Sequence, residues 1–274
     1  QATLVGLLRP VEIPLKTDSH NPFVILMVGV NGVGKTTTTL NLAAAFAEVG
    51  HRVLVLDLDP QGNASTGLGS LADKREFTTY DVLVGEVIEE CFVIQTELKN
   101  LYLIPSTTDL SSADIELASN KNRSKLLRTV LNNSDLSKYD YIFFDCPPSL
   151  NVLTVNALIA ADSLIIPLQS EFFALEGLSQ LLMSVREVRS LGNPSLRIEG
   201  IVLTMFDGRN RLSLQVEEDA RENLGELVFK TMIPRNVRIS EAPSFSMPVL
   251  SYDSRSKGAA AYRALAEEVL LRQN

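Results

Sequence analysis

The chain has 274 residues, of which 45% are hydrophobic and 21% charged, and its 25 Lys and Arg against 33 Asp and Glu give a formal net charge of −8. This composition excludes a disordered chain, and the acidic balance excludes a surface coated throughout with basic nucleic-acid-binding residues. Two cysteines, Cys91 and Cys146, cannot form a disulfide framework. Without a recognisable secretory signal or bilayer-spanning run, we expect a cytoplasmic protein with no stable membrane insertion.

Short apolar runs alternate with stretches of helical periodicity along the chain. The runs do not alternate polar and apolar residues, which is typical of strands buried on both faces of a parallel sheet. Leu42, Phe46 and Val49 show the helical spacing that recurs between the runs. The pattern predicts an α/β fold with a doubly wound, mostly parallel sheet flanked by helices, in one domain over 22–274 behind a leader at 1–21. The expected strands are 23–28, 52–57, 101–105, 141–144, 162–167, 198–204 and 228–233.

The first apolar run ends in a phosphate-binding motif. Residues 29–36 read Gly-Val-Asn-Gly-Val-Gly-Lys-Thr and fit G-x-x-x-x-G-K-[ST] between a strand and a helix. We expect Lys35 to reach the β- and γ-phosphates and the Thr36 hydroxyl to ligate Mg²⁺. An ordinary glycine-rich turn would explain the glycines but not the Lys-Thr pair, and the spacing differs from the G-x-G-x-x-G of dinucleotide sites. The residues expected to contact the nucleotide here are Asn31, Gly32, Val33, Gly34, Lys35, Thr36 and Thr37.

Three carboxylates follow two of the expected strands. Asp57 and Asp59 end the second strand, and Asp145 ends the strand at 141–144. In a doubly wound sheet, side chains at the carboxyl ends of strands face the crevice where ligands bind, which suits Mg²⁺ and water. An aspartate at a strand end can instead cap the following helix or turn. Three of them in a chain with a P-loop favour a functional site.

Several further segments resemble the ParA/Soj partition ATPases, namely 57–69, 139–150, 173–178, 203–207 and 233–243. The resemblance runs from about Thr36 to the C-terminus. It implies a P-loop NTPase fold of the deviant Walker A (SIMIBI) type, with ATP and Mg²⁺ as cofactors. It also implies hydrolysis of ATP to ADP and phosphate in an ATP-dependent nucleotide sandwich homodimer. By the same resemblance the protein binds DNA non-specifically, is stimulated by a ParB-type partner and associates with the nucleoid.

The resemblance also assigns catalytic and metal-binding roles. Lys35 matches the P-loop lysine and Thr36 the Mg²⁺ ligand. Asp59 matches the aspartate that positions the attacking water, and Asp145 the Walker B aspartate that holds Mg²⁺ through water. Asp57 is expected to support the metal shell.

Four residues in the C-terminal half of the chain match other functional positions of the family. Met205 and Pro234 match positions that line the adenine pocket. Arg209 and Arg238 match arginines implicated in DNA binding. The alternative for these two arginines is an ordinary solvated side chain, because no local run of positive charge surrounds them.

The P-loop departs from the family at one position. ParA-type proteins carry a signature lysine in K-G-G-V-G-K-T, and Val30 occupies its place here. In the family this lysine contacts the nucleotide across the dimer, and a comparable trans cation, the arginine finger, accelerates hydrolysis by about 10³–10⁵. We therefore expect Mg-ATP binding with weakened hydrolysis, and a nucleotide-binding scaffold with little turnover is the alternative.

The N-terminal region resembles a different family. Residues 22–38 are similar to the signal-recognition-particle receptor FtsY, and the leader is loosely similar to the end of that protein's helical N domain, so the chain looks chimeric. A targeting GTPase is therefore the second hypothesis. Two motifs of the targeting GTPases are missing, which argues against this hypothesis. Their guanine-binding motif T-K-x-D is replaced by Thr204-Met-Phe-Asp207, and their D-T-A-G-R motif is not matched by residues 145–149. A MinD-like membrane cycler is disfavoured because the tail at 259–274 mixes arginines with glutamates.

Overall fold

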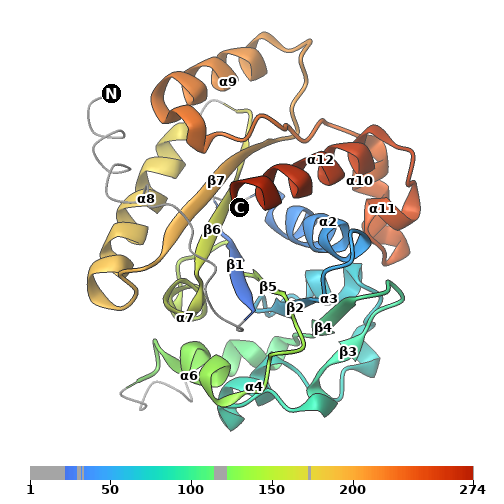
Figure 1. Cartoon of the computed structure of the whole chain (residues 1–274), viewed down its shortest axis with the longest axis vertical. Coiled ribbons are helices and arrows are strands. Elements are labelled where there is room, and N and C mark those ends of the chain that lie inside the picture. Colours follow the sequence, from blue (N-terminus) through green and yellow to red (C-terminus); the bar gives the residue numbers. More distant parts are fainter. Residues whose placement is uncertain (1–21, 30–31, 33, 114–121, 172–173, 274) are drawn as a thin grey trace.

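A computed structural model of the chain describes residues 22–29, 32, 34–113, 122–171 and 174–273. Seven strands form one sheet in the order β3-β4-β2-β5-β1-β6-β7, and all neighbours pair in parallel except β3 and β4 (Figure 1). This arrangement confirms the predicted doubly wound, mostly parallel sheet. The strands are β1 Phe23–Met27, β2 Val53–Asp57, β3 Ile94–Gln95, β4 Leu101–Ile104, β5 Tyr141–Asp145, β6 Ser163–Gln169 and β7 Arg197–Thr204.

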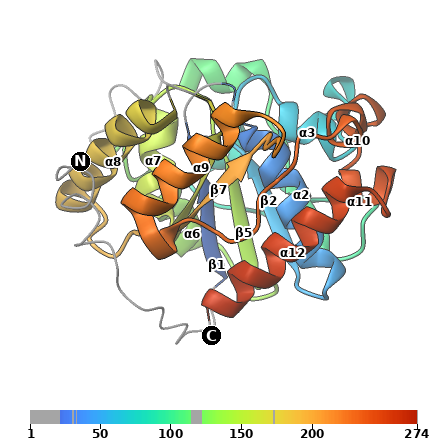
Figure 2. The same ribbon diagram turned by 90° about the horizontal axis from the view of Figure 1, so that it is seen from above.

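Helices cover both faces of the sheet. One face packs against α2, α3, α11 and α12, and the other against α4, α6, α7, α8 and α9, with the strands between the two layers (Figure 2). The α-helices are α2 Lys35–Glu48, α3 Asn63–Gly67, α4 Thr79–Gly85, α6 Leu126–Asn133, α7 Val152–Ala160, α8 Ala174–Leu191, α9 Arg211–Leu224, α10 Val237–Glu241, α11 Val249–Tyr252 and α12 Lys257–Arg272. Short 3₁₀ helices are η2 Ala72–Lys74, η3 Glu90–Phe92, η4 Thr108–Ser112, η6 Gly225–Leu227 and η7 Ala242–Phe245.

The two layers explain why the strand sequences are apolar throughout. Successive side chains of a strand point to opposite faces, so a strand with helices on both sides needs apolar residues at every position. In β1, Val24 and Leu26 belong to the core on one face, while Ile25 and Met27 belong to the core on the other. All four side chains are buried.

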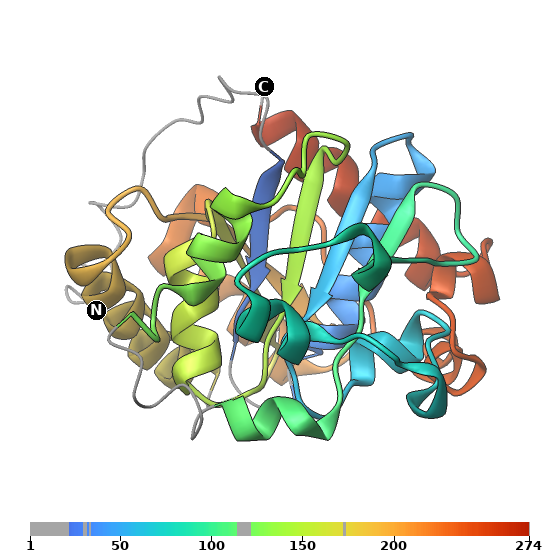
Figure 3. The same ribbon diagram turned by 90° about the horizontal axis from the view of Figure 1, so that it is seen from below.

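The strand register brings the predicted carboxylates together. β5 lies between β1 and β2, with Asp145 paired in register with Met27 on one side and with Asp57 on the other. Figure 3 shows these three strands side by side and running in the same direction. Their carboxyl ends therefore lie at one edge of the sheet, where the P-loop follows β1.

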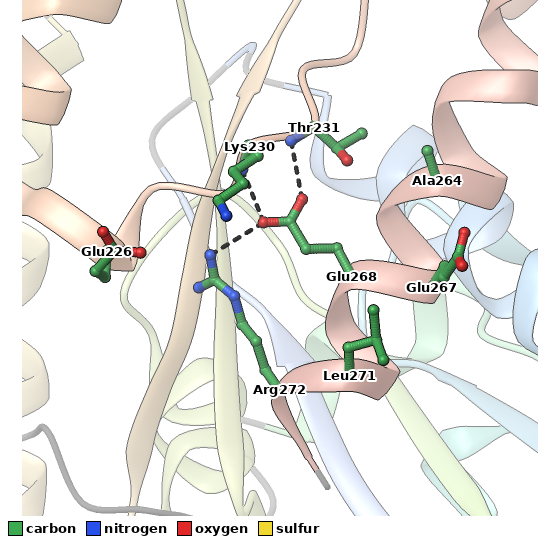
Figure 4. Close-up of a pocket in the computed structure, with 8 residues that line it drawn as sticks. All are labelled: Glu226, Lys230, Thr231, Ala264, Glu267, Glu268, Leu271 and Arg272. Carbon is green, nitrogen blue, oxygen red and sulfur yellow. Dashed lines mark hydrogen bonds and ion pairs between the residues drawn. The ribbon is translucent and has the colours of Figure 1, made fainter.

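The prediction of a strand at 228–233 is wrong. Only Val228 forms an isolated bridge, to Ile201 of β7, and the backbone amides of Lys230 and Thr231 bind the Glu268 carboxylate of α12 instead of a strand. Figure 4 shows these hydrogen bonds and the ion pair of Glu268 with Arg272, beside a surface pocket of about 670 Å³. The amides of Phe229 and Ile233 do donate to β7, but Glu268 takes the two amides between them and no continuous ladder forms. The two-residue β3 was not predicted, because its pairing partner rather than its own pattern defines it.

Candidate nucleotide-binding site

The turn after β1 leads into the N-terminus of α2. Gly32 and Gly34 have φ values of 78° and 80°, in the left-handed region that glycine adopts without steric cost. Gly34 is the N-cap of α2 and provides no side-chain cap, and a helix N-terminus of this kind suits an anion. Val30, Asn31 and Val33, all predicted parts of this loop, lie outside the described residues.

Lys35 starts α2 and is held inside the site. Its side chain is buried, and Nζ donates a hydrogen bond of 3.1 Å to the carbonyl oxygen of Gly29. Burial lowers the pKa of Lys35, and the negative charges of Asp145 and Asp59 partly oppose this effect. An ammonium group that has lost most of its water in this way gains from a phosphate oxygen placed in the loop.

Asp145 at the end of β5 accepts hydrogen bonds from two threonines of α2. Thr36 Oγ1 lies 2.8 Å from Oδ2, and Thr39 Oγ1 lies 3.0 Å from Oδ1. The carboxyl group is fully buried, and both its burial and the neighbouring charge of Asp57 raise its pKa. A divalent cation would favour the ionised form.

The oxygen atoms of this site suit Mg²⁺. In phosphate-transfer sites Mg²⁺ is bound through one or two carboxylates plus the substrate phosphates, not by an all-protein cage. Thr36 and Asp145 provide a hydroxyl and a carboxylate side by side. Within the described residues no group of three or more His, Cys, Asp and Glu side chains forms a metal cage.

Asp57 at the end of β2 binds the segment that follows it. Its Oδ2 accepts hydrogen bonds from the amide of Ser65 at 2.8 Å and from Ser65 Oγ at 2.6 Å, and its Oδ1 accepts one from the Asp59 amide at 3.1 Å. Burial raises the pKa of Asp57, and these hydrogen bonds oppose the rise. The carboxylate thus fixes the start of α3, and its expected support of the metal shell stays a prediction.

Asp59 lies in the turn between β2 and α3 and is buried. Its Oδ1 accepts a hydrogen bond of 3.0 Å from the Gln61 amide, and its carbonyl oxygen accepts one of 2.8 Å from the Gly62 amide. The two bonds close the turn around the carboxylate. Asp59 is one of the charged groups that act on Lys35, so the two predicted catalytic side chains share one site.

A cavity of about 270 Å³ adjoins the P-loop helix and includes both predicted adenine-pocket residues, Met205 and Pro234. Hydrogen bonds of 3.0 Å from the Phe206 amide to Ile233 and from the Arg235 amide to Phe206 hold their segments together. A mainly apolar cavity beside a phosphate-binding turn suits a nucleotide base. Gly34 and Thr37 of the P-loop region also line it.

Arg209 and Arg238 are exposed but carry ion pairs. Arg209 binds Asp207 through Nε and Nη2 at 3.0 Å each, and these bonds lower the pKa of Asp207 to about 2. Arg238 lies 2.9 Å from Glu241 and 3.3 Å from Asp253. Each arginine thus has an acidic companion, and hydrogen bonds of Phe206 with Ile233 and Arg235 join the two segments that precede them.

Sequence reasoning missed three residues that support this site. Thr39 holds Asp145, Ser65 holds Asp57, and Arg75 donates hydrogen bonds to several backbone oxygens near α3. The run of threonines after Lys35 could have indicated Thr39, because a residue four positions along a helix lies on the same face. Backbone acceptors leave no pattern in a sequence, so no signal could have indicated Arg75.

In the part of the chain that the structure describes, no helix combines the length and the apolar character needed to cross a membrane.

This chain is similar to one protein family and to several known proteins. A family described as an AAA domain matches residues 24–198. The chromosome partitioning protein ParA of Caulobacter vibrioides is 52% identical over 258 residues, covering 93% of this chain and 97% of that protein. The sporulation initiation inhibitor protein Soj of Bacillus subtilis is 50% identical over 238 residues, covering 87% and 94%. The crystal structure of cobyrinic acid a,c-diamide synthase from Mycobacterium smegmatis with bound ADP and magnesium has a TM-score of 0.79 and 35% identity, covering 91% of this chain and 94% of that one.

Proposed function

This chain belongs to the ParA/Soj family of partition ATPases, and on that premise we propose that it binds ATP with Mg²⁺ and hydrolyses it to ADP and phosphate in the partition of chromosomes or plasmids. One observation supports this above all others. Lys35, Thr36, Asp59 and Asp145 converge at the carboxyl ends of neighbouring strands, beside a cavity that suits a base. The relative solved with ADP and magnesium supports the choice of ligands.

The phosphates bind at the start of α2. Lys35 contacts the β- and γ-phosphate oxygens, and N–H groups of the helix N-terminus bind others. Thr36 and Asp145 would hold Mg²⁺, Asp145 through water, and the ion would neutralise charge that develops on the phosphate oxygens. Thr39 keeps the Asp145 carboxylate in place when Thr36 turns to the metal. Met205 and Pro234 bind the base.

Asp59 orients the attacking water. The Gln61 amide fixes one oxygen of its carboxylate, and the other can accept a hydrogen bond from water. The water oxygen forms a bond to the γ-phosphorus while the bond from that phosphorus to the β–γ bridging oxygen breaks, and ADP leaves with the bridging oxygen. The water proton passes to the phosphate produced.

DNA binding and assembly follow from the same family membership. We propose an ATP-dependent homodimer that binds DNA without sequence preference through Arg209 and Arg238, associates with the nucleoid and is stimulated by a ParB-type partner. The two arginines lie on neighbouring segments, which supports a shared phosphate-binding surface. Non-specific binding of this kind has a dissociation constant of about 10⁻⁴–10⁻⁶ M and depends strongly on salt.

Hydrolysis is weakened by Val30 in this proposal, because the trans lysine of the family is missing from the sequence. Val30 and the leader at 1–21 lie outside the described residues, so the resemblance of 1–38 to the signal-recognition-particle receptor stays a prediction. The family relatives give no support to a targeting GTPase.

The proposed ATP site is tested by equilibrium binding of Mg-ATP and Mg-GTP to the purified chain. We expect preferential binding of ATP and its loss in Lys35→Ala, because this side chain carries the buried charge that meets the phosphates. Lys138→Ala is the matched control, since Lys138 is a surface lysine that pairs with exposed Glu90 and lies over the Tyr139 ring, away from the P-loop. Tighter binding of GTP, or equal ATP affinity of the Lys35 variant, would contradict the proposal.

Hydrolysis is tested with Asp59→Ala in the presence of DNA and a ParB-type partner. We expect ATP affinity to be preserved and turnover to fall by about 10²–10⁴, the range for loss of a group that assists proton transfer or orients water. Asp73→Ala, a change at an exposed residue of η2, is the control. Unchanged turnover in the Asp59 variant would show that this carboxylate does not act on the water.

A further inference from the structure

The side chain of Arg75 holds the segment that follows Asp59. Arg75 Nε donates to the Ser70 carbonyl oxygen at 3.1 Å, and Nη2 donates to the same oxygen at 2.6 Å. Nη2 also lies 3.3 Å from the Gly62 carbonyl oxygen and 2.8 Å from Thr66 Oγ1. The guanidinium group thus contacts both ends and the middle of the segment that contains α3.

The same guanidinium group ties this segment to the sheet. Arg75 Nη1 donates a hydrogen bond of 2.6 Å to the carbonyl oxygen of Ser106, just beyond β4. The Ser106 amide in turn donates to Ser65 Oγ at 2.9 Å, and Ser65 is bound to Asp57 of β2. Two strand ends therefore hold α3, one through Asp57 and Ser65 and the other through Ser106 and Arg75.

Gly62 lies so close to Arg75 that a side chain at this position would clash with the guanidinium group. A Cβ atom on Gly62 would lie 2.2 Å from Arg75 Nη1 and 2.9 Å from the Ser106 carbonyl oxygen, and φ at Gly62 is 62°. A position of this kind needs glycine both for its backbone conformation and for the close approach of the guanidinium group. Gly62 is also the residue whose amide binds the carbonyl oxygen of Asp59 at 2.8 Å. The position of the Asp59 carboxylate therefore depends on where Gly62 is held.

We propose that Arg75 is a positioning residue for hydrolysis, which fixes the turn from Asp59 to Gly62 so that the Asp59 carboxylate meets the attacking water. This inference rests on the proposed ATPase function and on the role of Asp59 within it. Arginine suits the task because its planar fork presents five N–H donors in a fixed geometry, which a lysine cannot reproduce. The described contacts of Arg75 lie at 62–70 and Ser106, outside the P-loop and the base pocket.

The contacts predict which kinetic constant changes. ATP affinity depends on Lys35 and the start of α2, which are held independently of Arg75. A displaced Asp59 turn affects chiefly the attack by water, and a misplacement of about 1 Å can cost about 10²-fold in rate. Loss of the fork should therefore lower kcat by about 10- to 100-fold and leave KM and the ATP dissociation constant within about twofold.

The test compares Arg75→Ala and Arg75→Lys with the unaltered chain and with Arg52→Ala. Arg52 is a matched control, because it is also hydrogen-bonded beside β4, to the Tyr102 hydroxyl at 3.3 Å, but precedes β2 at the opposite end of the sheet. The measurements are ATP turnover with DNA and a ParB-type partner, ATP affinity, and amide hydrogen exchange of 62–70. We expect both Arg75 variants to hydrolyse slowly, to bind ATP normally and to exchange faster only in 62–70, whereas Arg52→Ala matches the unaltered chain.

Three results would overturn the inference. Normal turnover in Arg75→Ala, in an assay where Asp59→Ala is slow, would show that the turn does not need the guanidinium group. Full recovery in Arg75→Lys would show that charge rather than the fork matters. A parallel loss of ATP affinity and of exchange protection throughout the sheet would indicate a general role in folding. If the unaltered chain itself hydrolyses no ATP under these conditions, the proposed ATPase function fails and the positioning role fails with it.

Discussion

The buried carboxylates at the ends of β2 and β5 destabilise the folded protein when no ligand is bound. Asp57 and Asp145 lie in register on adjacent strands, and both are fully buried. Burial raises the pKa of both groups, that of Asp145 to about 7, and the charge of Asp59 adds to the rise at Asp57 while the charge of Asp57 adds to the rise at Asp145. A carboxyl group whose pKa is higher in the folded protein than in the unfolded chain binds more protons when folded, so its contribution to stability falls as the pH rises.

Asp145→Asn should therefore stabilise the protein while abolishing its use of Mg²⁺. Below pH 4 the wild-type carboxyl group is protonated in both states, and its penalty grows as the pH rises through the folded pKa of about 7. With nucleotide absent and metal removed by EDTA, we expect a gain of about 1–2 kcal/mol in the free energy of unfolding at pH 8 and less at pH 5.5. Urea unfolding at both pH values measures it, with the exposed Asp73→Asn as control. Equal gains at the two pH values would contradict the prediction.

Arg209 should bind DNA more tightly once its acidic companion is neutral. Asp207 occupies the guanidinium group with two hydrogen bonds at the exposed surface, so a DNA phosphate must replace it. We expect Asp207→Asn to raise DNA affinity about two- to fivefold, the range for an exposed ion pair, and Arg209→Ala to lower both affinity and salt dependence. A filter-binding titration over a range of salt concentrations measures both effects. A weaker complex with Asp207→Asn would show that the aspartate helps to hold Arg209 in its binding position.

Single residues differ in how well the sequence predicted them. Asp57 and Asp145 could be placed at one edge because strand ends in a parallel sheet share that edge. The pairing of Arg238 with Glu241 follows from helical spacing and could have been predicted, whereas Asp253 approaches it from another element. Arg75 could not be found, because its partners are backbone oxygens and a hydroxyl at positions set by the tertiary fold.

At the scale of elements, α2 connects the nucleotide site to the C-terminal helices. The Asn41 side chain donates a hydrogen bond of 2.7 Å to the Thr37 carbonyl oxygen and accepts one of 2.7 Å from the Val249 amide at the start of α11. Tyr252 at the end of α11 donates to Glu241, the partner of Arg238. A movement of the start of α2 on nucleotide binding would therefore reach the region of Arg238.

Asn41→Ala should destabilise the protein because it leaves the Val249 amide without its acceptor. An unpaired buried backbone donor costs about 1–3 kcal/mol, so we expect a loss of that size in the free energy of unfolding. Asn133→Ala is the control, because the Asn133 side chain makes an exposed hydrogen bond to Glu86. Urea unfolding checks the prediction, and equal effects of the two variants would contradict it.

The elements themselves were largely predictable, with two instructive exceptions. Unbroken apolar runs identified the buried parallel strands, since few other structures require apolar residues on two opposite faces. The run at 228–233 is apolar at both ends but polar at Lys230 and Thr231, whose amides bind Glu268, and it lies beside β7 without a ladder. β3 is too short to leave a pattern at all. In both cases tertiary contacts, rather than local composition, decide whether a strand forms.

At the scale of the whole molecule, the proposed homodimer lacks the trans lysine of the family, because Val30 occupies its position. We expect Val30→Lys to raise partner-stimulated ATP turnover, by at most about the 10³–10⁵-fold that a trans cation contributes in related NTPases. The measurement compares kcat of the two chains with DNA and a ParB-type partner present. Val49→Lys, which places the same charge at an exposed position beyond α2, is the control. Equal turnover with and without the lysine would show that hydrolysis does not depend on this charge.

The segment at 228–233 covers the edge of the sheet at β7, which affects aggregation at high protein concentration. An open sheet edge offers unpaired backbone groups to the strands of other molecules and so promotes aggregation. Here 228–233 runs along the outer side of β7, hydrogen-bonded to it through the amides of Phe229 and Ile233, while Glu268 occupies the amides of Lys230 and Thr231. A neighbouring chain therefore finds this edge already covered. Copies that lie close together are therefore hindered from joining their sheets at β7.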